Sequence, residues 1–138
     1  MRTRARFRDE SERGAVLVAG LLLSLALLIV IGVAVDVGRV FIERRELVSL
    51  ADWAALSGSQ ALDVEAIHAG QLVLDPSEAQ ATALAVFAGE PELQAYASAS
   101  SDAVSVEVER TIPTLLLRLV GLPTLTVKAQ ATAEPRAP

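Results

Sequence analysis

The chain has 138 residues, a formal net charge of −5 and no cysteine. A chain without cysteine forms neither disulfides nor thiolate metal sites. The net charge argues against nucleic-acid binding, because beyond Arg45 the chain has no cluster of the Lys and Arg residues with which proteins bind nucleic acid. Apolar residues make up 52% of the sequence and aromatic residues only 4%, so we expect a membrane segment next to one small folded domain.

The first thirteen residues are predicted to be a basic tail. They contain five arginines, whereas no Lys or Arg occurs between Glu46 and Glu109. Under the positive-inside rule, this asymmetry places residues 1–13 in the cytoplasm and the residues after Asp36 outside it. We therefore expect a cell-membrane protein with a cytoplasmic amino terminus and an acidic, extracytoplasmic carboxy-terminal part.

An uncharged apolar run from Gly14 to Val35 follows the tail. As an α-helix with a rise of about 1.5 Å per residue it spans roughly 33 Å, enough to cross a hydrocarbon core of about 30 Å. The sequence therefore predicts a single transmembrane helix over residues 14–36. A cleaved secretory signal is the alternative, because Gly32 and Ala34 resemble a cleavage site, but the apolar run of such a signal is only about 7–15 residues long.

The helix is predicted to continue beyond the membrane over residues 37–63. Apolar residues recur there at spacings of three and four, which is typical of one helix face, so we expect an unbroken helix from about residue 15 to about residue 62. Asp36, Arg39 and Glu43 are expected on the opposite, polar face. The predicted apolar stripe comprises Val37, Val40, Phe41, Val48, Ala51, Ala54, Ala55, Gly58, Ala61 and Leu62.

The second half of this stripe consists mostly of small residues. Small side chains let another helix or a sheet approach closely. Because an isolated amphipathic helix would expose too much apolar surface, we expect the stripe to hold the chain's own head domain. Packing of the same stripe against other subunits is the sharper alternative.

Four short stretches lie on or next to this helix: ERGA at 12–15, VDVGR at 35–39, ERREL at 43–47 and ADWAAL at 51–56. As a set they resemble the amino-terminal region of the TadE/TadG-like proteins of the bacterial tight adherence (Flp, type IVb) pilus system. The resemblance implies a single-pass, membrane-anchored accessory or minor pilin-like component of pilus assembly. Its implied partners are the lipid bilayer, other pilus or pseudopilin subunits, and the inner-membrane assembly platform.

Two residues depart from the pattern of that family. Trp53 stands where the family usually has a small residue. Pilin-type precursors are cleaved after a glycine such as Gly14 and carry a glutamate five residues later, whereas this chain has Ala19 there. We therefore expect an uncleaved membrane anchor and not a major filament subunit.

Residues 64–138 predict a small α+β head, and the fold expected for the whole chain is pilin-like. Asp75 is followed by Pro76 and, three residues after the cap, by Glu78, which together favour a helix start. A second helix is therefore expected over residues 77–89. Its predicted apolar face comprises Ala79, Ala83, Val86 and Phe87.

Three stretches of alternating apolar and polar residues predict a three-stranded antiparallel sheet. They lie at 92–100, 103–110 and 124–134. Between the second and third strands, residues 113–121 predict a short apolar helix that ends at a glycine. Its large apolar side chains are expected either to plug the head or to touch the membrane surface; they are Leu115, Leu116, Leu119 and Val120.

No catalytic, cofactor-binding or metal-binding residues are predicted, and we expect the protein not to be an enzyme. His68 is the only histidine, and it lacks the further ligands at fixed spacing that a metal site needs, so we expect it in a loop or at a helix end. The acid pairs Glu90 with Glu92 and Glu107 with Glu109 are expected on solvated surfaces. No phosphate-binding loop or nucleophile motif is present.

Two alternative functions stay open at this point. One is a membrane-tethered, extracytoplasmic binding module, for example for a cation attracted by the acidic head, although no acidic stretch has calcium-loop spacing. The other is a secreted domain that is released when a signal peptide is removed.

Overall fold

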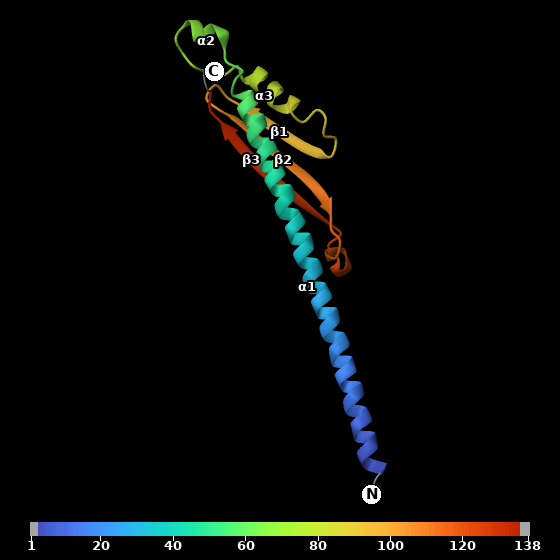
Figure 1. Ribbon diagram of the computed structural model, residues 1–138. Coiled ribbons are helices and arrows are strands. Elements are labelled where there is room, and N and C mark those ends of the chain that lie inside the picture. The colour runs from blue at the N-terminus through green and yellow to red at the C-terminus, as the bar shows by residue number, and fades with distance from the viewer. Residues whose placement is uncertain (1–2, 136–138) are drawn as a thin grey trace.

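The computed structural model describes the backbone of residues 3–135 and the side chains of residues 13–135 (Figure 1). The predicted α+β fold is confirmed, with a long amino-terminal helix that continues into a small head. The elements in chain order are α1 (Thr3–Gly58), α2 (Val64–His68), α3 (Pro76–Ala85), β1 (Leu93–Ala99), β2 (Val104–Pro113), the 3₁₀ helix η1 (Leu117–Val120) and β3 (Thr124–Ala133).

Helix α1 runs without a break from the apolar segment into the head (Figure 1). From Arg13 onward it is long and apolar enough to cross a membrane. Every large apolar side chain from Val16 to Val30 is more than half exposed, so no other described part of the chain covers them. A lipid environment suits so long a stretch of exposed apolar surface.

The three strands form one antiparallel sheet in the order β1-β2-β3. Alternation places one side chain in two on the covered face, where Val104, Val106 and Val108 are fully buried. The opposite face is polar and open. A cross-strand hydrogen bond joins the hydroxyl groups of Ser105 and Thr132 at 2.9 Å on that face, as expected for a sheet with one solvated side.

Helices α1 and α3 cover the buried face of the sheet, with α1 over β2 and β3 and α3 over β1 (Figure 1). Their contact residues are small. Ala51 and Ala54 of α1 and Ala79 and Ala83 of α3 are all fully buried in the core. The expectation that the small-residue half of the stripe holds the chain's own head is therefore confirmed.

Gly58, the last residue of α1, lies where α1 closely approaches α3. A Cβ atom added there would lie 2.7 Å from the carbonyl oxygen of Ala79 and 3.1 Å from Cγ1 of Val104. A backbone oxygen cannot rotate away as a side chain can. The two helices therefore require a residue without a side chain at this position.

Gly58→Ala is expected to lower the free energy of unfolding of the head by about 1–3 kcal/mol, because the new methyl group forces α1 and α3 apart. Gly38→Ala is the matched control, since a Cβ atom at Gly38 meets nothing within 4 Å and alanine favours a helix. Thermal unfolding of both full-length variants in detergent measures the difference. If both substitutions raised the free energy of unfolding by the same amount, the result would contradict the close approach of the helices.

The buried face of α1 near the apolar segment differs from the predicted stripe. Val37 and Phe41 were expected to be covered but are 43% and 68% exposed, whereas Asp36 is only 2% exposed and Leu47 is fully buried. The prediction that Asp36 and Glu43 lie on the solvent face was wrong. The reason is that the head supplies hydrogen-bond partners for both carboxylates, and polar groups with partners tolerate burial.

The connections between the main elements differ in part from the predictions. Helix α2 was not predicted; Asp63 caps it by accepting hydrogen bonds from the N–H groups of Glu65 and Ala66. The apolar helix predicted to begin near Pro113 begins only at Leu117, because Pro113 still pairs with β3 as the last residue of β2.

One end of each of two predicted helices agrees with the structure, whereas α3 ends at Ala85 and not near Gly89 as predicted. η1 ends at Gly121, whose φ of 89° suits glycine. Helix α3 is capped by Asp75 as predicted, with the carboxylate accepting hydrogen bonds from the N–H groups of Ser77 and Glu78.

Candidate docking surface

The loop after β2 is joined to α1 by one buried carboxylate, that of Asp36. Its Oδ1 accepts a hydrogen bond from the N–H of Leu115 at 2.8 Å, and its Oδ2 accepts bonds from Leu116 at 2.8 Å and Leu117 at 2.9 Å. No side chain of the loop itself caps η1. Asp36 therefore does for η1 what an N-cap side chain normally does, but from a different element.

A second polar contact between α1 and the sheet lies farther from the membrane segment. Arg110 of β2 donates a hydrogen bond to Glu43 of α1 at 2.9 Å, and its guanidinium lies 3.5 Å from Glu90 and 3.9 Å from Glu46. Burial lowers the pKa of Arg110, but the hydrogen bond to Glu43 and the charges of Glu43, Glu46 and Glu90 outweigh it, so the pKa is raised. Arg110 therefore stays charged inside the contact.

Glu43→Gln is expected to lower the free energy of unfolding of the head by about 1–3 kcal/mol. The Arg110 side chain is only 13% exposed, and its Nε is already buried without a hydrogen-bond partner in the described chain, so it depends on the charge of Glu43.

Glu46→Gln is the matched control for that measurement. Its carboxylate lies farther from Arg110 and is 56% exposed, so the free energy of unfolding should change by less than about 0.5 kcal/mol. Chemical denaturation of the two full-length variants in detergent gives the comparison. A loss for Glu46→Gln as large as for Glu43→Gln would argue against a specific Glu43–Arg110 pair.

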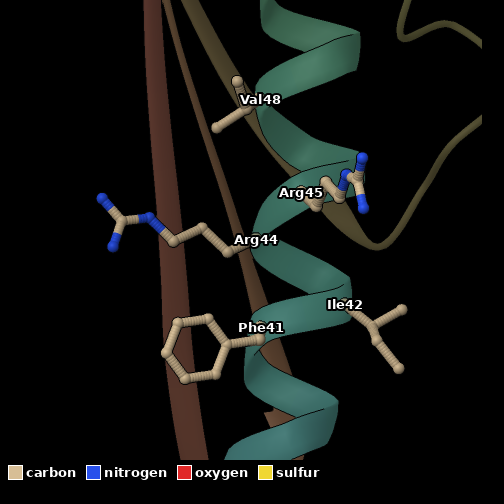
Figure 2. A pocket seen from close by; sticks show the side chains of 5 residues that line it. All are labelled: Phe41, Ile42, Arg44, Arg45 and Val48. Carbon is tan, nitrogen blue, oxygen red and sulfur yellow. The ribbon is translucent and has the colours of Figure 1, made fainter.

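The side of α1 that the head leaves uncovered carries exposed apolar and basic residues just beyond the predicted membrane segment. Phe41 and Ile42 are 68% and 69% exposed. With three neighbours they line an open pocket on the helix surface (Figure 2); the full lining is Phe41, Ile42, Arg44, Arg45 and Val48. We call these five residues the docking surface.

The docking surface wraps around the exposed side of the helix. In Figure 2, Phe41 and Arg44 point to one side of α1, and Ile42 points to the other. Arg44 and Val48 also line a groove that continues onto Glu107, Lys128 and Gln130 of the sheet. An approaching helix could therefore contact α1 and the edge of β3 together.

The alanines of α1 do not belong to this surface. Ala51, Ala54 and Ala55 are at most 1% exposed because the head covers them, so they are not available to a second subunit. Trp53, the departure from the family pattern, is 61% exposed and therefore leaves the packing of the alanines undisturbed.

The residues considered for chemistry lie on open surfaces. His68, expected in a loop or at a helix end, is the last residue of α2, and its Nδ1 lies 2.7 Å from the carbonyl oxygen of Val64. Glu107 and Glu109 share the open face of the sheet with Lys128. Among the described residues, no three His, Asp or Glu side chains lie close enough together to hold a metal ion.

Comparison with protein families gives two matches that together cover most of the chain. A family described as "Putative Flp pilus-assembly TadE/G-like" matches residues 14–61, and one described as "Putative Tad-like Flp pilus-assembly" matches residues 43–133. No similar protein was found among curated proteins or among solved structures. The second match alone covers more than half of the chain, and the two overlap on residues 43–61, which include Arg44, Arg45 and Val48 of the docking surface.

Proposed function

This chain belongs to the Tad family of putative Flp pilus-assembly proteins, as the resemblance in its sequence predicted, and from this premise we propose that it is an accessory or minor pilin-like component of the assembly, anchored in the membrane. The observation that carries the proposal is α1, whose apolar half suits a bilayer and whose other half is part of the core of the head. Such a protein acts by holding and presenting surfaces and not by chemistry.

We propose the following arrangement relative to the membrane. Residues 1–13 lie in the cytoplasm, residues 14–36 cross the bilayer once, residues 37–63 lie outside and continue the helix as far as Gly58, and residues 64–138 form the extracytoplasmic head. The arginines before the apolar segment support this orientation. The exposure of the apolar side chains of α1 supports the placement of the bilayer.

The proposed partner of the docking surface is an apolar, acidic helix face of another pilus subunit or of the inner-membrane assembly platform. Phe41 and Ile42 provide apolar contact area, and Arg44 and Arg45 provide positive charge on both sides of it. Large aromatic and aliphatic residues next to arginine are the residue types that contribute most to protein interfaces. The position next to the membrane favours partners that are themselves membrane-bound.

The test is recovery of other Flp assembly proteins with the double variant Phe41→Ser, Ile42→Ser from crosslinked membranes. We expect recovery to fall about tenfold or more, because both side chains are central to the proposed contact. The head should keep its thermal stability, since neither side chain belongs to the core.

Tyr96→Ser is the matched control for this test. Tyr96 is similarly exposed, at 60%, but lies on β1, away from the docking surface. Unchanged recovery with the double variant would contradict the proposed docking role.

A further inference from the structure

The loop between β2 and β3, residues 114–122, exposes a cluster of large apolar side chains. Leu119 and Val120 are 75% and 68% exposed, and Leu115 and Leu122 are about as exposed as they are buried. The one charged residue of the loop is Arg118. Exposed apolar clusters of this kind indicate a contact with something outside the described chain.

The loop lies beside α1 at the end of the head nearest the apolar segment (Figure 1). The side chain of Leu116 fills the space next to Gly32, since a Cβ atom added at Gly32 would overlap Cδ1 of Leu116. Gly32 lies one helical turn, roughly 6 Å, on the membrane side of Asp36. The loop therefore reaches the last turn of the predicted transmembrane segment.

Backbone N–H groups of the loop donate hydrogen bonds to other groups of the chain. A loop surrounded by water would not need this pairing. The carboxylate of Asp36 accepts hydrogen bonds from the N–H groups of residues 115–117. The N–H of Thr114 bonds to the carbonyl of Pro123, and the N–H of Leu122 bonds to that of Leu117, both at 3.0 Å. Unpaired backbone groups are costly in a lipid environment, so this pairing fits contact with lipid.

We infer that residues 114–122 form a second membrane contact, in which Leu119, Val120 and Leu122 enter the interface of the leaflet that faces the head. Lipid is the partner because the loop is continuous with the exposed apolar surface of α1, on which Val33 and Val35 are also partly exposed. Arg118 can stay at the level of the phosphate groups, as long basic side chains do at interfaces. The inference rests on the membrane anchoring of α1 proposed above.

Two contacts with one bilayer fix the tilt of the head. α1 alone permits rotation about its axis and tilting in the membrane, whereas a second contact beside it limits both. The docking surface on the far side of α1 is thereby held at a constant height above the bilayer. This positioning suits a component that must meet other membrane-bound subunits.

The test uses the full-length protein in phosphatidylcholine–phosphatidylglycerol vesicles. The chain has no cysteine, so one introduced cysteine is a unique site for a nitrobenzoxadiazole fluorophore. The positions are Leu119→Cys and Val120→Cys in the loop, Leu27→Cys within the span, and Ser101→Cys in the β1–β2 turn. Phospholipids with a nitroxide near the top of the acyl chain quench fluorophores at the interface, and iodide quenches those in water.

We expect the labels at positions 119 and 120 to be quenched by the nitroxide lipid about threefold or more above the label at 101, and to be protected from iodide. Iodide quenching at 119 and 120 equal to that at 101, with the label at 27 still in lipid, would overturn the loop contact and leave the anchoring intact. Protection from both quenchers would also overturn it, since the loop would then contact protein. A label at 27 outside the lipid would overturn the contact and the anchoring together.

Discussion

Asp36→Asn is expected to release the loop of residues 114–122 from α1 and to lower the melting temperature of the head by about 5 °C or more. The Asp36 carboxylate now satisfies three backbone N–H groups with two charged oxygens. An asparagine offers one uncharged oxygen and turns an amide donor toward the same N–H groups. At least one buried donor therefore loses its partner.

The measurement for this variant is hydrogen exchange of the amides of Leu115, Leu116 and Leu117 in the full-length protein in nanodiscs. Their exchange should become about tenfold faster or more, while the amides of the sheet change less. Asp52→Asn is the control, because Asp52 lies on the exposed side of the same helix. Unchanged protection of these amides in Asp36→Asn would show that the carboxylate does not hold the loop.

The contacts of Asp36 also explain how a charged group can lie at the edge of the proposed membrane segment. A carboxylate exposed to lipid is costly. Here the head donates the hydrogen bonds that water would otherwise give, and Asp36 is 2% exposed. The same contact places the apolar loop next to the bilayer, so one residue links the anchor, the head and the proposed second membrane contact.

The sequence was sufficient to predict the elements whose pattern is local. Strand alternation, for example of Val104, Val106 and Val108, identified the covered face of the sheet, and Asp75 with Pro76 identified the start of α3. The absence of a break after the apolar run predicted the continuation of α1 into the head. Each of these patterns acts through neighbours within one or two turns.

The residues that were misplaced have partners far away in the sequence. Asp36 binds residues some eighty positions later, and Glu43 pairs with Arg110. Periodicity alone assigns such charged residues to solvent, because it cannot include the donors that the head supplies. The buried face of α1 differs from the predicted stripe for the same reason, so Phe41 lies on the docking surface and not in the core.

Two signals in the sequence pointed toward these sites. Phe41 and Ile42 are adjacent, and adjacent residues lie about 100° apart around a helix, so one narrow stripe could not bury both. Gly32 and Asp36 are four residues apart and therefore share a face. The small residue leaves space on that face for an apolar side chain of a loop, and the carboxylate can cap the backbone of the same loop. Residues 115–117 use both features.

The second large effect concerns the dependence of the head on α1. Leu47, Ala51, Ala54 and Ala55 belong to the same core cluster as the buried residues of α3 and the sheet. Without α1, the buried face of the three-stranded sheet would be exposed to water over β2 and β3. A sheet of this size that buries mainly Ala and Val gains little stability by itself, so we expect residues 64–138 alone not to fold.

Thermal unfolding of two fragments tests most directly that the outer half of α1 is part of the head's core. One fragment contains residues 35–138, with the outer half of α1 and Asp36, and the other contains residues 64–138. Circular dichroism should show a cooperative transition for the first fragment and none for the second. A cooperative transition of residues 64–138 at the melting temperature of the longer fragment would contradict this account.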